Sequence, residues 1–416
     1  MNLLLVAYFF PPCGDTGAAR PAAMAKYLER LGHRVTVLTT SAYGTLADDA
    51  ESGVVRTTDA QLWRARLHGA QHVDSLYDSD SYSGRPHPLS RLLVPEPLVA
   101  AWAPFARRRA LRLQQAEHFD CVITSSPPES VHLIGRSLRR RGTPWVADIR
   151  DAWTFEPLRP RFPTPVQRGL DKRLERRWLG AADAVVCVSE PAAADLRARG
   201  IADPHVIANG WDPDSAPEAG ASSGVELDPG RISLVYTGRF GSYGRDPAPL
   251  VDAIAKLAAE DPELAGRVEL VVAGPLTDAE RALFARRVSP ARIVLAGSLP
   301  RERALALQRE ADALLLIAHP TRSQLLNYKL FEYLASGRPI LALAEGTEAG
   351  RVAGSLGAEV VRADDREAIG GALRELAEAR LRPPPADAVA PYTYPAPAEA
   401  MAAAAGRAIR ASTTSA

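Results

Sequence analysis

The chain has 416 residues, of which 46% are hydrophobic and 24% charged, and its formal net charge is +1. This length exceeds one ordinary core and favours two or three domains, and the near-neutral charge argues against a general nucleic-acid binder. No run of about 18 apolar residues exists, so we expect no membrane-spanning helix.

The N-terminal apolar stretch lacks a basic flank and stops at Pro11, which favours a buried strand over a signal peptide. Three cysteines, Cys13, Cys121 and Cys187, have no metal-type spacing. Together these features predict a cytoplasmic protein with reduced thiols and no metal site.

Apolar runs of strand length alternate with amphipathic helical segments, which is the pattern of parallel sheets covered by helices on both faces. In the first half the predicted strands are 3–9, 35–39, 121–124, 145–147, 184–188 and 205–207, and the first helix is 18–31. Residues 41–100 are rich in Ser, Asp, Gly and Pro, and predict loops and short helices that cover a binding cleft.

The composition of residues 212–230 predicts a linker, after which the alternating pattern restarts. The later predicted strands are 232–236, 268–273, 293–296, 313–317, 340–343 and 359–361, and the helices between them include 249–260, 301–310 and 326–336. We therefore predict an α/β protein with two Rossmann-like domains, 1–209 and 210–390, followed by a tail, 391–416, with a helix at 395–410.

A glycine-containing segment, 10–19, follows the first predicted strand. Gly14 and Gly17 permit close backbone approach, and the next helix offers N–H groups to an anion. The segment is not GxGxxG, and the second strand ends without an acid for a ribose, which disfavours a dinucleotide dehydrogenase. A turn that only links strand to helix is the plain alternative.

A second segment, 236–245, follows the strand that opens the second domain. Gly238 frees the backbone there, and Arg239 and Arg245 can neutralise a diphosphate, because a guanidinium donates two hydrogen bonds at once. A solvated basic loop is the alternative.

A third segment, 324–337, predicts a helix on which Gln324 and Glu332 lie eight residues apart, roughly 12 Å along the axis and close to one face. Two polar groups so placed can grip the two ends of an extended ligand. Apolar neighbours from Leu330 to Leu334 make a purely solvated role for Glu332 the weaker interpretation.

These segments, in this order, resemble the family-four retaining glycosyltransferases of GT-B architecture along nearly the whole chain. The most specific stretch, Tyr328 to Pro339, resembles the nucleotide-sugar signature of that family, in which two glutamates are separated by seven intervening residues. The resemblance implies that Glu332 holds the nucleotide ribose. Gln324 stands where the family has its first glutamate, which contacts the donor sugar or aids charge stabilisation, so the donor sugar is in question.

The resemblance also implies roles for other residues. For the donor they are Gly14, Gly17, Gly238, Gly297, Leu299, Asn327 and Tyr328, with Arg239, Arg245 and Lys329 beside the leaving diphosphate; for the acceptor or the sugar they are Asp15, Ser125, Asp148, Arg150 and Asp151. Arg245 replaces a lysine that the family usually has one position earlier, and many members have a histidine where Ser125 aligns. His132 itself is predicted to lie on a helix surface.

The function implied is transfer of a sugar, with retention, from a nucleoside-diphosphate sugar to a hydroxyl acceptor in a cleft between two facing domains. The acceptor is a glycan, a lipid-linked sugar or a natural product, as in polysaccharide or glycoconjugate biosynthesis, and neither a metal nor another cofactor is required. Two alternatives stay open, an epimerase of the same fold and a non-catalytic nucleotide-sugar-binding partner.

Three basic clusters in the first half, 107–112, 136–141 and 172–177, suggest contact with an anionic membrane at its inner face. Solvated faces of arginine-rich helices are the alternative.

Overall fold

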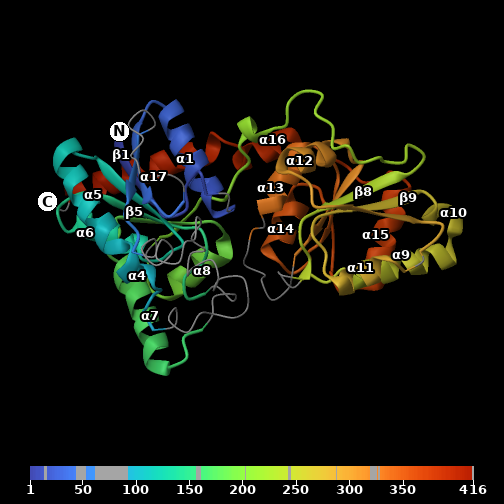
Figure 1. Ribbon diagram of the computed structural model, residues 1–416, viewed down its shortest axis with the longest axis horizontal. Coiled ribbons are helices and arrows are strands. Elements are labelled where there is room, and N and C mark those ends of the chain that lie inside the picture. Colours follow the sequence, from blue (N-terminus) through green and yellow to red (C-terminus); the bar gives the residue numbers. More distant parts are fainter. Residues whose placement is uncertain are drawn as a thin grey trace. The chain divides into compact units, whose positions relative to one another are not determined.

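The computed structural model describes residues 1–13, 16–43, 53–60, 92–155, 161–201, 203–241, 245–286, 288–318, 326 and 328–414. The chain forms two compact units (Figure 1). The first unit combines Met1–Ala208 with Tyr394–Ala416, and the second is Asn209–Thr393. The predicted boundary lay between residues 209 and 210, and the binding roles assigned to the two domains stay predictions.

The first unit is built on a parallel sheet of seven strands in the order β3-β2-β1-β4-β5-β6-β7. The strands are β1 (Asn2–Ala7), β2 (Arg34–Thr40), β3 (Val54–Thr57), β4 (Cys121–Ser126), β5 (Trp145–Ile149), β6 (Ala184–Cys187) and β7 (His205–Val206). Their side chains are almost all buried, because helices cover both faces of the sheet.

Alternate residues of each strand belong to two different cores. On one face Leu4, Val6 and Val122 pack against α5 (Ala103–Glu117) and α6 (Val131–Arg139), and the same core includes α7 (Pro165–Leu179) and α8 (Glu190–Ala198). On the other face Leu3 and Leu5 pack in a core with α1 (Ala19–Arg30) and α17 (Ala396–Thr414). A short helix, α4 (Leu98–Ala101), precedes α5.

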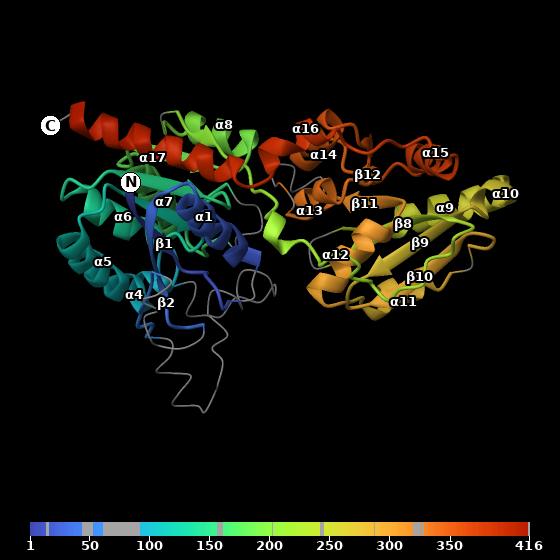
Figure 2. The same cartoon turned by 90° about the horizontal axis from the view of Figure 1, so that it is seen from above.

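The last helix, α17, completes the first unit, although the whole second unit separates it in sequence from the strands that it covers (Figure 2). Its small residues Ala398, Ala404, Ala405 and Ala408 and the side chain of Met401 are fully buried. Small side chains let the helix lie close to the sheet, and the sheet in turn removes its apolar face from water.

The second unit has a parallel sheet of six strands in the order β10-β9-β8-β11-β12-β13. The strands are β8 (Ile232–Thr237), β9 (Val268–Ala273), β10 (Arg292–Gly297), β11 (Ala313–Ile317), β12 (Ile340–Leu343) and β13 (Glu359–Val361), and the helices are α9 (Ala248–Glu260), α10 (Pro262–Ala265), α11 (Asp278–Phe284), α12 (Arg301–Glu310), α13 (Tyr328–Ser336), α14 (Glu348–Ser355), α15 (Arg366–Ala377) and α16 (Ala386–Val389). One apolar core joins β8 and β9 to α9, α11 and α15.

The predicted fold class is confirmed, since both units are α/β with parallel sheets. One strand, β3, was not predicted, because its four residues lie inside the polar stretch that suggested only loops and short helices. No helix in the described part of the chain is both long and apolar enough to span a bilayer.

Candidate functional site

The strand order reverses between β8 and β11 in the second unit, and between β1 and β4 in the first. In open parallel sheets, ligands bind beyond the carboxyl ends of the strands at such a switch point, because the two connections leave in opposite directions. The predicted residues fall beside these two edges. Gly238 and Arg239 follow β8, and α13 comes next after β11, whereas Gly17 follows β1 and Ser125 is the last residue but one of β4.

The backbone beyond β8 is held close to the backbone beyond β9. Gly238 has a φ of +145°, a conformation that favours glycine, and its N–H donates to Ala273 O over 2.9 Å. A Cβ atom on Gly274 would lie 1.9 Å from Gly238 O. Both glycines are therefore needed for this close approach, which sets the path of the loop that carries Arg239.

The two arginines of this loop are linked through one carbonyl group. Arg239 O accepts hydrogen bonds from Tyr236 Oη over 2.7 Å and from Arg245 Nη1 over 3.0 Å. Gly241 N donates to Glu280 Oε1 over 2.8 Å, which ties the loop to α11. The Arg239 side chain is exposed, so its guanidinium is open to an anion at this edge.

Glu332 lies on α13 with only 2% of its surface exposed, and both of its oxygens have cationic partners. Arg301 Nη1 lies 2.9 Å from Oε1, and Lys329 Nζ lies 2.8 Å from Oε2. The partner side chains are 52% and 32% exposed, respectively. A buried carboxylate thus sits beneath two cations that reach solvent, so a ribose hydroxyl that binds it must approach beside one of these cations or in its place.

Arg301 was not singled out from the sequence. It is the first residue of α12, and it follows Gly297, which has a φ of +70°, and the half-buried Leu299. Burial raises the pKa of Tyr328 overall, although Arg301 is close enough to that hydroxyl group to lower it in part. A single arginine thus joins the segment of the predicted donor residues Gly297 and Leu299 to the predicted ribose ligand Glu332.

In the first unit, Asp148 is the centre of a buried polar cluster at the ends of β4 and β5. Arg20 holds its carboxylate with two bonds, from Nη2 over 2.9 Å and from Nε over 3.1 Å. Ser125 Oγ donates to the same carboxylate over 2.8 Å. Burial lowers the pKa of Arg20, but the charge and hydrogen bonds of Asp148, together with the nearby Tyr394 and Cys187, outweigh this effect, so the pKa is raised overall.

Sequence reasoning missed Arg20, although a signal existed. It shares one face of α1 with Met24, Tyr27 and Leu28, all buried, at helical spacing. An arginine on such an apolar face needs a buried acid as its partner. In this chain the partner acid is Asp148, which lies near the end of strand β5.

Arg150 and Asp151 follow Asp148 in the chain. The side chain of Arg150 is buried, and it donates to the backbone carbonyls of Gly17, Ser126 and Pro127. This pattern fixes the segment after β1 to the segment after β4, which is a structural role. Contact of Arg150 or of the half-buried Asp151 with acceptor or sugar stays a prediction.

His132 corrects one prediction, because it is fully buried and not on a helix surface. Its Nδ1 lies 2.8 Å from Thr124 Oγ1, which also accepts from Trp145 Nε1 over 2.8 Å. Its ring stacks on Trp153 at 6.2 Å between centroids. Burial lowers the pKa of His132 to about 3, so the ring is neutral at ordinary pH.

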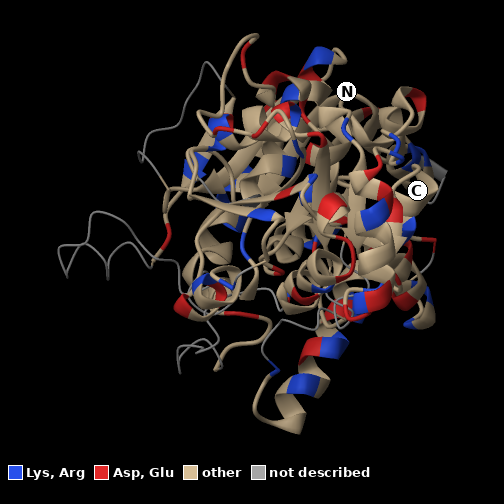
Figure 3. Cartoon of the chain, turned by 90° about the vertical axis from the view of Figure 1, so that its right-hand side faces the viewer, with Lys and Arg blue, Asp and Glu red and all other residues tan. Residues whose placement is uncertain are grey.

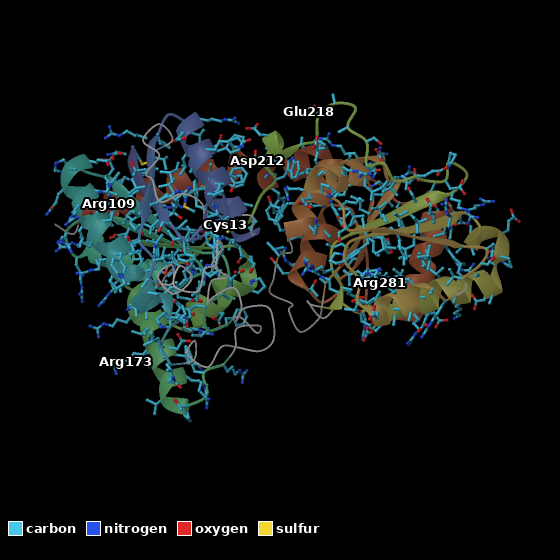
Figure 4. The ribbon with its side chains drawn as sticks, in the orientation of Figure 1. Cys13, Arg109, Arg173, Asp212, Glu218 and Arg281 are labelled. Atoms are coloured by element: carbon cyan, nitrogen blue, oxygen red, sulfur yellow. The ribbon has the colours of Figure 1, made fainter. Side chains whose placement is uncertain are left out.

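Four predicted site residues, Gly14, Asp15, Gln324 and Asn327, lie outside the described residues. The roles assigned to them stay predictions. Figure 4 shows the side chains of the described residues and labels Cys13, which immediately precedes the first of these gaps.

Two family models match the chain and together span most of it. Residues 21–215 match Glycosyltransferase Family 4, and residues 231–379 match Glycosyl transferases group 1. No curated protein matches the chain.

Several solved structures share the fold at low sequence identity. Sucrose-phosphate synthase from Thermosynechococcus elongatus has a TM-score of 0.63 at 16% identity, covering 97% of each chain. The structure of Anabaena Alr3699/HepE in complex with UDP has a TM-score of 0.56 at 15% sequence identity, and the match covers 100% of this chain and 98% of that one. A putative UDP-N-acetylglucosamine 2-epimerase from Listeria monocytogenes has a TM-score of 0.54 at 15% sequence identity, and the match covers 97% of this chain and 95% of that one. A synthase and a putative epimerase thus share the fold of this chain, so the fold alone does not assign the activity.

Proposed function

The chain belongs to glycosyltransferase family 4, and from this premise we propose that it is a retaining, metal-independent transferase that moves a sugar to a hydroxyl acceptor. Transfer of a sugar from a nucleotide sugar is the activity of the family. The observation that carries the proposal is the edge beyond β8 and β11. There Arg239, Arg245 and Lys329 accompany the buried carboxylate of Glu332.

The leaving nucleoside diphosphate develops negative charge as the bond to the sugar breaks, and fixed positive groups at that point lower the barrier. Arg239 and Arg245 belong to one loop whose backbone is held by three hydrogen bonds. Lys329 lies in the first turn of α13, where the helix dipole also favours an anion. These groups supply the charge stabilisation in our proposal.

Nucleotide binding exchanges ion pairs at Glu332 in this proposal. The diphosphate draws the amino group of Lys329 away from Glu332 Oε2, and the freed oxygen accepts a ribose hydroxyl. The exchange keeps each charge paired, so the buried carboxylate is never left alone, a state that would cost several kcal/mol.

The test is a thermal-shift and binding screen of the purified protein against UDP, GDP, dTDP, ADP, their sugars and NAD(P)H. We expect selective stabilisation by one nucleoside diphosphate and its sugar. Glu332→Ala should weaken that binding by at least about 1 kcal/mol, the value of a lost hydrogen bond to a charged group. Arg239→Ala with Arg245→Ala should abolish turnover while the protein stays folded. A shift with NAD(P)H alone would refute the proposal.

The two alternatives predict different products. Acceptor-independent conversion of the bound nucleotide sugar to its epimer would indicate an epimerase. Binding of the nucleotide sugar without transfer to any acceptor in a panel of glycans, lipid-linked sugars and natural products would indicate the non-catalytic partner. The polar cluster around Ser125 and Asp148 is our proposed position for the acceptor side.

We also propose that the first unit binds an anionic membrane at its inner face, because the three predicted basic clusters adjoin one another. Arg107 Nε donates to Ser137 Oγ over 2.9 Å, which links α5 to α6. The pKa of Arg136 is lowered by burial and by the charges of Arg140 and Arg177, which links α6 to α7. Cations this close repel one another, and an anionic surface relieves the repulsion.

The helix α7 carries exposed apolar residues in addition to its basic residues, and the basic residues are coloured blue in Figure 3. Val166 and Leu170 are 80% and 44% exposed, and they share one side of the helix with Arg173 and Arg177 at spacings of three and four residues. Such a stripe suits insertion beside lipid headgroups. Figure 4 shows that Arg173 points away from the body of the unit.

Flotation with vesicles that contain anionic lipid tests the membrane proposal. Arg173→Glu with Arg177→Glu should reduce co-flotation at low salt by at least about tenfold, since each cation near such a surface contributes about 1 kcal/mol. The control is the same pair of reversals at Arg281 and Arg382, both exposed in the second unit. Equal loss in both variants, or no binding by the unaltered protein, would refute it.

A further inference from the structure

Gln308 lies on α12 with 1% of its surface exposed, and its amide bridges two segments of the candidate donor site. Its Nε2 donates to Thr237 Oγ1 over 2.9 Å and to Glu332 Oε2 over 3.4 Å. Thr237 ends β8, immediately before the loop of Arg239, whereas Glu332 belongs to α13. One buried NH2 group thus joins the start of the loop that carries Arg239, the proposed phosphate loop, to Glu332, the proposed ribose ligand.

Thr237, which accepts the shorter of these two hydrogen bonds, is itself held in place by a buried tyrosine. Thr237 N donates to Tyr333 Oη over 3.1 Å, and Thr237 Oγ1 lies 3.3 Å from the same hydroxyl. Tyr333 is fully buried on α13. Gln308 therefore has little freedom to move, and what it fixes is the relation of Glu332 to the end of β8.

This arrangement leaves Gln308 Oε1 buried without a hydrogen-bond partner among the described residues. Turning the amide over would place that oxygen against the carboxylate of Glu332, which is worse electrostatically. An apolar side chain of similar size would avoid the unpaired oxygen altogether. Packing alone thus does not explain a glutamine here, whereas a requirement for one NH2 group that donates to both Thr237 and Glu332 does.

We propose that Gln308 is a positioning residue that orients the carboxylate of Glu332 for recognition of the nucleotide ribose. The inference rests on the proposed function. The other two partners of Glu332, Arg301 and Lys329, reach solvent and are available to a bound diphosphate, but the amide of Gln308 is confined. It keeps the carboxylate in place while Lys329 moves to the phosphate.

The experiment compares dissociation constants for UDP, GDP and ADP with those for their 2′-deoxy counterparts. For the nucleotide that binds best, we expect the unaltered protein to prefer the ribose form by about tenfold or more, as a charged hydrogen bond implies. Gln308→Leu should reduce this preference to about threefold or less, with little change in affinity for the deoxy form. A merely structural role would weaken both forms equally.

Gln114→Leu is the matched control, because Gln114 is a helical glutamine of the first unit whose amide bonds Phe119 O and N. It should leave the preference unchanged. Gln308→Glu is a second variant, whose carboxyl group would lie against Thr237 and against Glu332, which itself is paired with Arg301 and Lys329. Protonated, it can still donate to Glu332 and retain the preference; ionised at higher pH, it repels Glu332, so the preference should fall as pH rises.

The outcomes separate the two ideas. A protein that binds no nucleotide, or that binds ribose and deoxyribose forms equally, overturns the proposed ribose site and this inference together. A protein that prefers ribose, and whose Gln308→Leu variant keeps that preference, overturns this inference alone.

Discussion

At the scale of single residues, the close contact of two backbones beyond β8 and β9 depends on Gly274. We predict that Gly274→Ala destabilises the second unit by about 1–3 kcal/mol, because the new methyl group meets Gly238 O at 1.9 Å and that atom belongs to backbone. The loop of Arg239 must then shift, and nucleotide affinity should fall as well. Denaturant unfolding and a nucleotide titration measure the two effects.

Gly371→Ala is the matched control for that substitution. Gly371 lies on α15 in the same unit, and a Cβ atom there would meet nothing within 4 Å. Alanine in a helix should raise stability by up to about 1 kcal/mol and leave nucleotide affinity unchanged. Normal nucleotide affinity in Gly274→Ala would contradict the importance of the close approach.

The buried ring of His132 predicts a dependence of stability on pH. Its pKa falls from 6.5 to about 3 on folding, so below pH 6.5 the unfolded chain binds a proton that the folded chain does not. The contribution of His132 to stability is complete above pH 6.5 and decreases toward pH 3, by about 1.4 kcal/mol per unit.

We compare His132→Phe with the unaltered protein, because the ring shape is kept while the titration is removed. Between pH 6.5 and pH 5 the unaltered protein should lose about 2 kcal/mol more free energy of unfolding than the variant. Tryptophan fluorescence is the readout, since five of the six tryptophans belong to the first unit. A constant difference over this range would show that the ring is not buried as described.

At the scale of elements, α11 is tied to the proposed phosphate loop through its capping residue. Glu280 Oε2 accepts from Thr277 N over 2.7 Å, which completes a capping box, while Oε1 holds Gly241 N. We predict that Glu280→Ala lowers stability by about 1 kcal/mol and also weakens nucleotide binding, although Glu280 is not a proposed ligand.

Thr164→Ala, which removes the capping box of α7 in the first unit, is the control. It should lower stability by a similar amount, about 1 kcal/mol, with no effect on nucleotide affinity. Calorimetric titration with the preferred nucleotide distinguishes the two variants. Unchanged affinity in Glu280→Ala would mean that the loop does not depend on α11.

At the scale of the whole molecule, α17 stabilises the unit from which it is most distant in sequence. Met401 is fully buried in the core shared by α17, α1 and the sheet of the first unit. We predict that Met401→Ala costs about 2–4 kcal/mol, and that the loss falls on the first unit. Tryptophan fluorescence should show its earlier unfolding.

Leu376→Ala is the corresponding control, because Leu376 is 2% exposed in the core of the second unit. It should lower the unfolding temperature of the second unit, which nucleotide binding reports, and leave the main tryptophan transition in place. An unfolding curve of Met401→Ala that matches the unaltered protein would mean that α17 contributes little to the first unit.

The sequence determined most elements, because strand-length apolar runs and helical periodicity are local properties. Strand β9 was predicted at its observed bounds, and so were β11, β12 and β13. It also indicated that Arg239 and Arg245 lie in the segment after β8, and the binding role of these two arginines stays a prediction. It did not predict β3, whose polar neighbours hide a strand that pairs with β2.

Only the tertiary structure decided which side chains meet. Arg20 and Asp148 are 128 residues apart, and Gln308 and Thr237 are 71 apart, yet each pair forms a buried bond. The sheet order places these residues together, because strands that adjoin at a switch point come from distant parts of the chain. It also decided that His132 is buried, since its environment comes from Trp145 and Trp153, which its own helix does not reveal.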